Sequence, residues 1–235
     1  MTPGTYPNVA IPFCLYATSN TSIEVDWGDG TTETFTSEDA VEDVFPTHAY
    51  NTAGPYSVSI TSSDWDSIYI TDCRNLDLDT WKGSLTAVNS PLPHLAGTHT
   101  CADTYTDWAH IPNVLQYTFY KCWNLSQIPE NLYVNNPLVS SLTYAFNGCK
   151  AMTTIPQNLL AYPTAVSNLS GFISGSQMSL GAFSINIASP NVDNATAFSG
   201  ANSSVTRTIN VPADSTTKAT FDAIASASYY TVTAV

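Results

Sequence analysis

The chain has 235 residues, of which 43% are apolar and 11% are charged, so it can bury a core while presenting few charges at its surface. The formal net charge of −13 lies almost wholly in residues 1–80, which hold 13 acidic and one basic residue (−12), against six and five (−1) in residues 81–235. Such a field repels phosphate groups, which argues against nucleic acid or an anionic membrane surface as partners, and no apolar run is long enough to predict a membrane span.

The first 71 residues are predicted to form short β-strands. Most of the β-prone runs alternate polar and apolar side chains, and clusters of turn-forming residues separate them. Several short strands without a helical period are typical of a small β-sandwich. The runs cover residues 11–16, 22–27, 31–35, 56–60 and 67–70.

A glycine-rich turn follows the second of these strands, where residues 25–31 read Val-Asp-Trp-Gly-Asp-Gly-Thr. Trp27 can anchor a core, and the two glycines permit a positive φ. The carboxylates of Asp26 and Asp29 can accept hydrogen bonds from turn amides. A calcium site remains the alternative, although no EF-hand spacing orders its candidate ligands. These candidates are Asp26, Asp29, Glu38, Asp39, Glu42 and Asp43.

This turn resembles the conserved turn of the PKD domain, and residues 48–58, His-Ala-Tyr-Asn-Thr-Ala-Gly-Pro-Tyr-Ser-Val, resemble its return strand. The resemblance implies an immunoglobulin-like sandwich over residues 1–71 that acts in binding or as a spacer. His48 is expected to be a packed, hydrogen-bonded residue rather than a metal ligand. The residues with a structural role in this motif are Trp27, Gly28, Asp29, Gly30, His48, Tyr50, Gly54 and Tyr56.

Residues 72–235 contain a repeat with a period of 27 residues. Residues 117–132 align with residues 144–159, and the phenylalanine register continues in two further copies. A period of about 20–29 residues is that of leucine-rich repeats, whose units stack because none can bury its apolar face alone. The predicted core positions are Phe119, Cys122, Leu125, Ile128, Phe146, Cys149, Met152, Ile155, Phe172 and Phe198.

The pattern Phe-x-x-Cys-x-x-Leu-x-x-Ile-Pro-x-x-Leu resembles the BspA-like leucine-rich repeat of bacterial surface proteins. It implies a solenoid in which each coil has a short strand and a loop or helical turn, with Pro129 and Pro156 ending the strand. A strand ending at Pro212, capped by Asp214 or Ser215 and followed by a helix over residues 218–224, is expected to close the array. The predicted fold is therefore mainly β, a PKD-like sandwich followed by a BspA-like solenoid with a short C-terminal cap helix. The structure of residues 81–112 is left open.

The five cysteines are predicted to be reduced, because their number is odd and no C-x-x-C occurs. Cys73, Cys101, Cys122 and Cys149 recur at intervals of 28, 21 and 27 residues, as equivalent positions of a repeat would. No export signal is visible at the N-terminus, which favours assembly in a cytoplasm or a signal that has been removed.

No catalytic fingerprint is present, so we expect no enzymatic activity. A glycan hydrolase would need paired carboxylates, and residues 81–235 hold only six acids. One cluster could bind zinc or supply a Cys-His pair, but its spacing matches no common zinc site, and ordinary loop histidines are the expectation. This cluster comprises His94, His99, Cys101, Asp103, Asp107 and His110.

Aromatic side chains are the stronger candidates for binding, since the chain has 13 Tyr and five Trp but few charges. Together with Asn and Ser they suit the recognition of a sugar or a protein. The alternative is that they pack on the flanks of the coils. The candidate ligand-binding residues are Tyr105, Trp108, Tyr117, Tyr120, Trp123, Tyr133 and Tyr144.

These patterns predict a non-enzymatic protein without a cofactor, calcium being left open. The first hypothesis is a bacteriophage virion protein such as a head fibre, a decoration protein or a tail-associated module. It would lie on the virion surface and contact other virion proteins and a host glycan or protein. The alternative is a bacterial cell-surface adhesin, and a homo-oligomer is left open. We expect the acidic N-terminal part to dock with salt dependence, and the repeat part to make the distal contact with little salt dependence.

Overall fold

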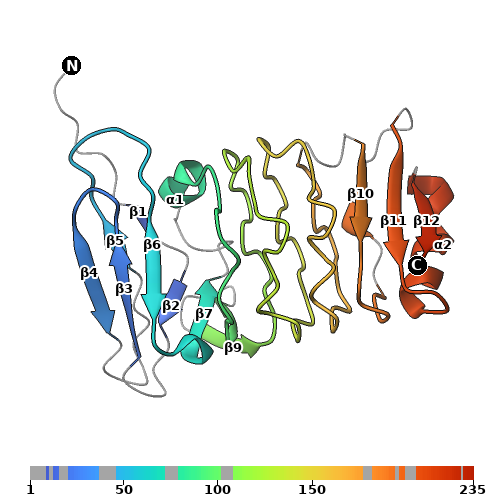
Figure 1. Ribbon diagram of the computed structural model, residues 1–235, viewed down its shortest axis with the longest axis horizontal. Coiled ribbons are helices and arrows are strands. Elements are labelled where there is room, and N and C mark those ends of the chain that lie inside the picture. Colours follow the sequence, from blue (N-terminus) through green and yellow to red (C-terminus); the bar gives the residue numbers. More distant parts are fainter. Residues whose placement is uncertain are drawn as a thin grey trace.

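The computed structural model has an elongated, mainly β fold, with the N-terminal strands at one end and the C-terminal strands at the other (Figure 1). Strand accounts for 26% and helix for 10% of it, which confirms the predicted fold class at this level. No helix in the part of the chain described below is long and apolar enough to cross a membrane. The structure describes residues 9–10, 13–15, 21–36, 46–71, 79–101, 108–176, 182–193, 196–198, 205–228 and 230–235.

The N-terminal sheet has the order β4-β3-β6, in which both neighbours run antiparallel to β3. Ile23 and Val25 of β3 are fully buried while Glu24 and Asp26 are exposed, as expected for a strand with one covered face. A separate pair joins β1 to β5. The bounds are β1 Val9–Ala10, β3 Ser22–Asp26, β4 Thr32–Thr36, β5 Thr47–His48 and β6 Ser59–Ser62.

The strand predicted over residues 56–60 begins later than expected, at Ser59. The Tyr56 hydroxyl donates a hydrogen bond to the Thr52 carbonyl oxygen at 2.8 Å, and its ring stacks on Tyr50 at 4.0 Å. These contacts hold residues 52–56 in a loop, so the extended conformation starts only after it.

A four-stranded sheet crosses the predicted boundary between residues 71 and 72. Its order is β2-β7-β8-β9, and β7 pairs in parallel with β8, with Tyr69 opposite Gly97. A cut at the predicted boundary would separate these two strands, so the experiments proposed below use the whole chain. The bounds are β2 Phe13–Leu15, β7 Ile68–Thr71, β8 Gly97–Cys101 and β9 Trp108–Pro112.

The structure of residues 81–112, which could not be assigned from the sequence, thus comprises two strands and the end of a short helix. The 3-10 turn η1 (Trp65–Ser67) immediately precedes β7, and helix α1 (Asp79–Ser84) lies between β7 and β8. A hydrogen bond of 2.9 Å from the Ala96 amide to the Ile68 carbonyl continues the β7–β8 pairing.

Residues 113–176 form neighbouring segments, and backbone hydrogen bonds between these segments join residues that are about one repeat period apart in the sequence. Val114, Ser141 and Asn168 form successive parallel bridges. The Phe119 amide donates to the Ala145 carbonyl oxygen, and the Phe146 amide to the Phe172 carbonyl oxygen, both at 2.8 Å. We call each such segment a coil.

Only isolated bridges occur in these coils, in place of the short strand expected in each repeat. The Pro129 carbonyl oxygen accepts a hydrogen bond from the Leu132 amide at 3.3 Å, and Pro156 accepts one from Leu159 at 3.2 Å. The two prolines thus begin turns, and the prediction that they end strands is wrong. Left-handed residues within the coils interrupt the extended conformation before a longer ladder can form.

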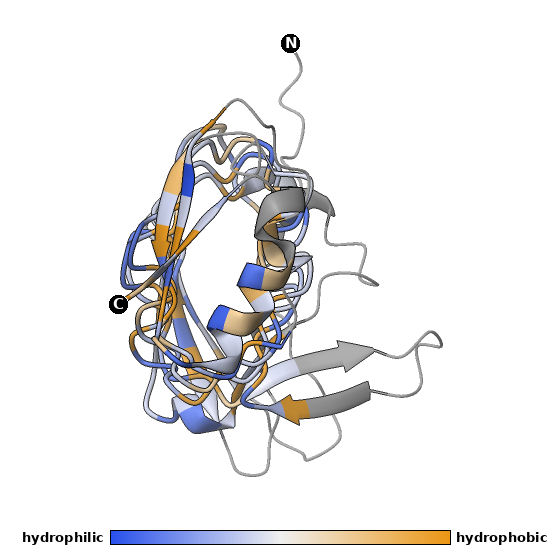
Figure 2. Cartoon of the chain, turned by 90° about the vertical axis from the view of Figure 1, so that its right-hand side faces the viewer, coloured by the Kyte–Doolittle hydropathy of each residue, from blue (hydrophilic) through white to orange (hydrophobic). Residues whose placement is uncertain are grey.

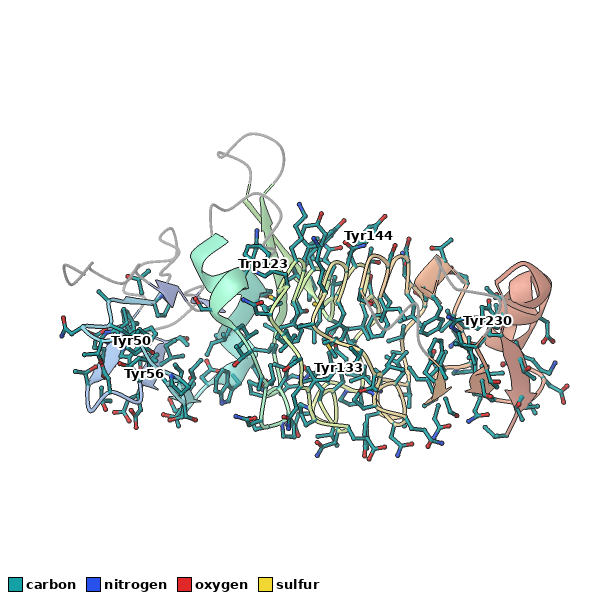
Figure 3. All side chains as sticks on the ribbon, turned by 90° about the horizontal axis from the view of Figure 1, so that it is seen from above. Tyr50, Tyr56, Trp123, Tyr133, Tyr144 and Tyr230 are labelled. Atoms are coloured by element: carbon teal, nitrogen blue, oxygen red, sulfur yellow. The ribbon has the colours of Figure 1, made fainter. Side chains whose placement is uncertain are left out.

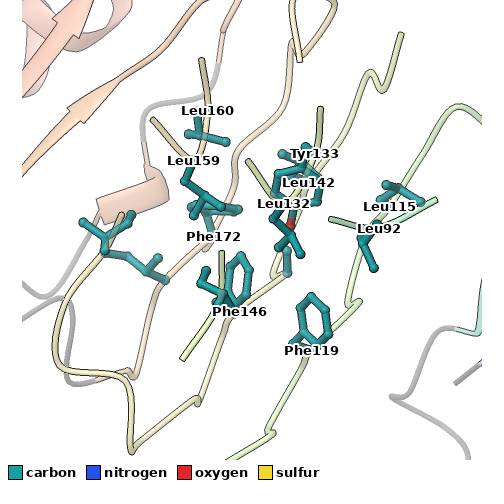
Figure 4. Packing of buried hydrophobic residues seen from close by; sticks show 14 of the residues in the cluster. Leu92, Leu115, Phe119, Leu132, Tyr133, Leu142, Phe146, Leu159, Leu160 and Phe172 are labelled. Carbon is teal, nitrogen blue, oxygen red and sulfur yellow. The ribbon is translucent and has the colours of Figure 1, made fainter. Parts of the chain in front are cut away.

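A row of aromatic rings runs through the coils (Figure 4). The ring of Phe146 lies 5.3 Å from that of Phe119 and 5.3 Å from that of Phe172. Phe198, in the 3-10 turn η3 (Thr196–Phe198), continues the row 6.5 Å from Phe172. Because each ring contacts its neighbours in the row, the coils share one continuous core.

The C-terminal end of the row is covered by helix α2 (Thr216–Ser228), which lies across the end of the molecule (Figure 2). Ser215 caps this helix, because its Oγ accepts a hydrogen bond of 3.0 Å from the Lys218 amide. Phe221 of α2 is fully buried, and its ring lies 5.9 Å from that of Phe198. The parallel sheet beside it contains β10 (Phe183–Asn186), β11 (Arg207–Val211) and β12 (Thr231–Ala234).

The cysteine prediction can be tested by mass. Cys122 and Cys149 are buried and form no disulfide, and the Cys149 Sγ donates to the Phe119 carbonyl oxygen at 3.1 Å. Burial raises the pKa of the Cys149 thiol to about 12, which suppresses its reactivity in the folded protein. The side chains of Cys14, Cys73 and Cys101 lie outside the described residues.

We expect alkylation without reductant to add five labels in denaturant, one for each cysteine of the sequence, and to leave Cys149 unlabelled in the native protein. Intact mass gives the count and peptide mass gives the position. A denatured protein that takes up three labels or fewer would contain a disulfide and would contradict the prediction.

Candidate functional site

The carboxylates of the glycine-rich turn are engaged within the turn itself. Asp26 Oδ1 accepts from the Gly28 amide at 2.9 Å, and Asp29 Oδ1 accepts from the amide of Thr31 at 3.0 Å and from its hydroxyl at 2.6 Å. Asp29 Oδ2 lies 2.8 Å from His48 Nε2. The bonds from Thr31, followed by that from His48, lower the pKa of Asp29 to about 2.

These contacts favour the structural role of the turn over the calcium alternative. No three His, Cys, Asp or Glu residues come close enough to hold a metal ion in the described part of the chain. The remaining candidate ligands, Glu38, Asp39, Glu42 and Asp43, lie outside it.

Trp27 is the centre of the packing around this turn. It is fully buried, stacks on His48 at 4.8 Å and meets Phe35 edge-on at 6.3 Å. The Tyr50 hydroxyl donates to the Trp27 carbonyl oxygen at 2.9 Å. Gly28 has a φ of 74°, and a Cβ there would come within 2.6 Å of the Ser57 carbonyl oxygen. Both the conformation and the close approach therefore require glycine at this position.

The histidine cluster predicted from the sequence does not assemble among the described residues. His94 Nδ1 instead lies 2.5 Å from Asp66 Oδ1, a contact that joins the N-terminal strands to the following part. His99 and His110 pair in the register of β8 and β9, and their side chains lie outside the described residues, as do Asp103, Asp107 and the Cys101 side chain. A depression beside His94 has a volume of ≈ 10 Å³, room for about one water molecule.

Of the seven candidate aromatic residues, four lie on neighbouring coils, and three of these four are half-buried or exposed. Tyr133 has 0% exposure and lies inside the coils, and burial raises the pKa of its hydroxyl, so we remove it from the set (Figure 3). Tyr105 and the Trp108 side chain lie outside the described residues. The remaining four come from the turns of two consecutive coils. We call Tyr117, Tyr120, Trp123 and Tyr144 the aromatic edge.

Three rings of the aromatic edge, those of Tyr117, Tyr120 and Tyr144, contact one another. Tyr117 and Tyr144 are stacked with their centroids 5.2 Å apart, and Tyr120 meets Tyr117 at 78°. Tyr117 is only 8% exposed, so it supports the outer rings, whereas Trp123 is 36% exposed. The Trp123 indole packs on Gly83 of α1, where a Cβ would lie 2.9 Å from it.

Three residues of these turns have a left-handed backbone although they are not glycine. The φ angles of Tyr117, Lys121 and Tyr144 are 55°, 58° and 54°. The equivalent positions one period later include Gly171, after Tyr144, and Gly148, after Lys121, both also at positive φ. A left-handed residue other than glycine costs about 1–2 kcal/mol. The chain therefore keeps Tyr and Lys where glycine would lower the strain, and such strain is characteristic of functional sites.

A polar ladder runs along the coils. The Asn210 amide group donates to Asn186 at 2.7 Å, Asn186 to Asn158 at 2.6 Å, and Asn158 to the Glu130 carboxylate at 2.7 Å. Every donor in this series points toward the carboxylate, an arrangement in which the bonds polarise one another. Our sequence analysis missed this ladder, although the alignment of Asn131 with Asn158 gave a signal for an asparagine position.

Comparison with models of protein families, with curated proteins and with solved structures finds no match. The chemistry of the site must therefore be judged from its own residues. The aromatic edge offers flat apolar faces, phenol hydroxyls and neighbouring amides, which suit reversible binding.

Proposed function

We propose that this chain is a non-enzymatic virion surface protein, a head fibre, decoration protein or tail-associated module, whose aromatic edge binds a glycan on the host surface. In this proposal the N-terminal part is a PKD-like sandwich that docks on the virion. The coils form a BspA-like leucine-rich-repeat solenoid that holds the aromatic edge away from the virion.

The architecture in this proposal is supported by the packing around Trp27 and by the hydrogen bonds that repeat at the sequence period. The positive φ angles recur as well, at Tyr117, Tyr144 and Gly171. Stacked units that bury their apolar faces only against one another are the defining feature of repeat proteins.

The observation that carries the binding function is the left-handed backbone of Tyr117 and Tyr144 beneath stacked rings. Glycine adopts this conformation without the steric cost, and at Gly171 it also leaves room for the Tyr144 ring, since a Cβ there would come within 2.2 Å of that ring. Selection for ligand contact explains why aromatic residues are kept at this energetic cost.

A bacterial cell-surface adhesin is the second candidate, favoured by the likeness of the repeat pattern to bacterial surface proteins. It would use the same edge for the same kind of contact. Neighbouring genes separate the two, since capsid and portal genes favour the virion protein, whereas export genes favour the adhesin.

The test of the binding function is Tyr144→Gly in the 235-residue chain. This change removes a ring from the edge but also relieves the left-handed strain, and it places at residue 144 the residue found one period later. We expect retention on an array of bacterial surface polysaccharides to fall at least tenfold, while the free energy of unfolding changes by less than about 2 kcal/mol.

Tyr162→Ala is the matched control, because Tyr162 is also a half-buried tyrosine of the coils but lies outside the turns of the edge. It should leave retention unchanged. Equal retention of the wild type and Tyr144→Gly, or no retention of either, would contradict the proposed function.

A further inference from the structure

The aromatic edge is the one place in residues 113–176 where charges gather, and they are positive. This stretch contains two lysines, Lys121 and Lys150, and one acid, Glu130, which gives a net charge of +1 in a chain of −13. Both lysines are exposed. Glu130 already accepts hydrogen bonds from the side chain and the backbone amide of Asn158.

Lys121 is built into the edge. Its ammonium group lies 5.1 Å from the centre of the Tyr120 ring, close enough for a cation–π interaction. Its stem packs on the next coil, since a Cβ on Gly148 would lie 3.3 Å from Lys121 Cγ. The backbone of Lys121 has the same left-handed strain as the tyrosines, so this residue too is kept where glycine would be favoured.

Lys150 is brought to the same edge by the pairing of the coils. The Ala151 amide donates to the Trp123 carbonyl oxygen at 2.9 Å, which places the adjacent Lys150 alongside Trp123. Two exposed lysines on consecutive coils thus accompany aromatic rings that come from the same two coils.

We propose that the ligand of the aromatic edge is an anionic polysaccharide, whose sugar faces rest on Tyr120, Tyr144 and Trp123 and whose acidic groups meet Lys121 and Lys150. This inference rests on the proposed function and deepens it by naming the class of ligand. It also changes the expected salt dependence, because two solvated ion pairs add an attraction that salt screens.

A saccharide fits this edge better than a protein partner. A stable protein interface buries about 1,200–2,000 Å² around apolar anchors, and the two most exposed large apolar side chains of the described residues, Val235 and Leu138, are not part of the edge. Trp123 is the one large apolar side chain of the edge that is substantially exposed. The surrounding polar groups, among them the half-buried Asn147, can bond hydroxyl groups instead.

The acidic N-terminal part does not prevent this binding. Its strands lie at one end of the long axis, while residues 113–176 occupy the middle (Figure 1). Charges in water are screened beyond about 8 Å at physiological ionic strength, so the charges of those distant strands contribute little to the field at the edge, where Lys121 and Lys150 are exposed.

The test measures binding of the 235-residue chain to three immobilised polymers by biolayer interferometry. Polygalacturonate is an anionic polysaccharide, dextran is a neutral one, and polyglutamate is an anion without sugar. The variant is Lys121→Gln/Lys150→Gln. The control is Lys218→Gln, which removes a half-buried lysine on α2 that pairs with Asp222.

We expect the wild type to prefer polygalacturonate to the other two polymers at least tenfold, and the double variant to lose this preference. Raising the salt concentration should weaken wild-type binding but have little effect on the double variant. The control should behave as the wild type.

Each other outcome overturns a defined part of the proposal. Equal binding of polygalacturonate by the wild type and the double variant would show that Lys121 and Lys150 do not contact the ligand. Dextran bound as well as polygalacturonate would exclude the anionic class but leave the proposed function intact. Polyglutamate bound equally well would exclude a saccharide, and no binding to any polymer, together with no retention on the polysaccharide array, would exclude the proposed function as well.

Discussion

Replacing Phe146 by Ala is expected to lower the free energy of unfolding by about 3–5 kcal/mol, the range for removing a buried aromatic side chain. Phe146 has 0% exposure and contacts the rings on the coils before and after it. Its loss would leave a cavity between two coils that share backbone hydrogen bonds, so neither coil can collapse to fill it. Chemical denaturation monitored by circular dichroism measures the effect.

Leu138→Ala is the matched control for this experiment. Leu138 lies in the same coils and is also a large apolar side chain, but it is 61% exposed. Its replacement should change the free energy of unfolding by no more than about 0.5 kcal/mol. If Phe146→Ala behaved like Leu138→Ala, the row of phenylalanine rings would not be the core of the repeat.

The second large effect is expected for Trp27→Ala, which should cost about 3–5 kcal/mol in the free energy of unfolding. Trp27 is fully buried, and its ring supports His48, whose partner is Asp29. Removing the ring therefore also weakens the contact that joins β5 to the turn after β3. Hydrogen exchange followed by mass spectrometry should show faster exchange in β3 and β4.

Trp27→Phe is the conservative comparison, because it retains an aromatic face for His48. It loses the hydrogen bond of 3.2 Å from the indole nitrogen to Glu33, which lies at an exposed position. We expect a smaller cost, about 1–2 kcal/mol, since part of the burial remains. Equal exchange rates in the wild type and Trp27→Ala would show that the N-terminal sheet does not depend on this anchor.

The local features of the chain could be predicted from its sequence. Alternation over residues 22–27 indicated β3, since side chains of a strand face opposite sides in turn. Pro212 marked the end of β11, and Ser215 was one of two residues named as the cap of α2. In each case neighbouring residues carry the information, and no distant contact is needed to read it.

The surface of the site could be predicted only in part. The sequence treats Tyr120 and Tyr133 alike, yet Tyr133 is fully buried while Tyr120 is half-buried on the edge. The direction of each ring depends on the turn that carries it and on the coil stacked above. Gly171 stands one period after Tyr144, and this glycine was the only sequence signal for a left-handed position in the repeat. That Tyr144 itself has a left-handed backbone is shown only by the backbone angles.

By itself, the sequence determined the β character of the chain and the period of its repeat, because both depend on the spacing of side chains along a single strand or coil. Only the tertiary structure decided that β7 pairs with β8 and that Lys121 and Lys150 accompany one aromatic edge. These arrangements join residues that are far apart in the chain. Every residue offers the same backbone hydrogen-bonding groups, whatever its side chain, so the sequence alone does not show which distant segments will pair.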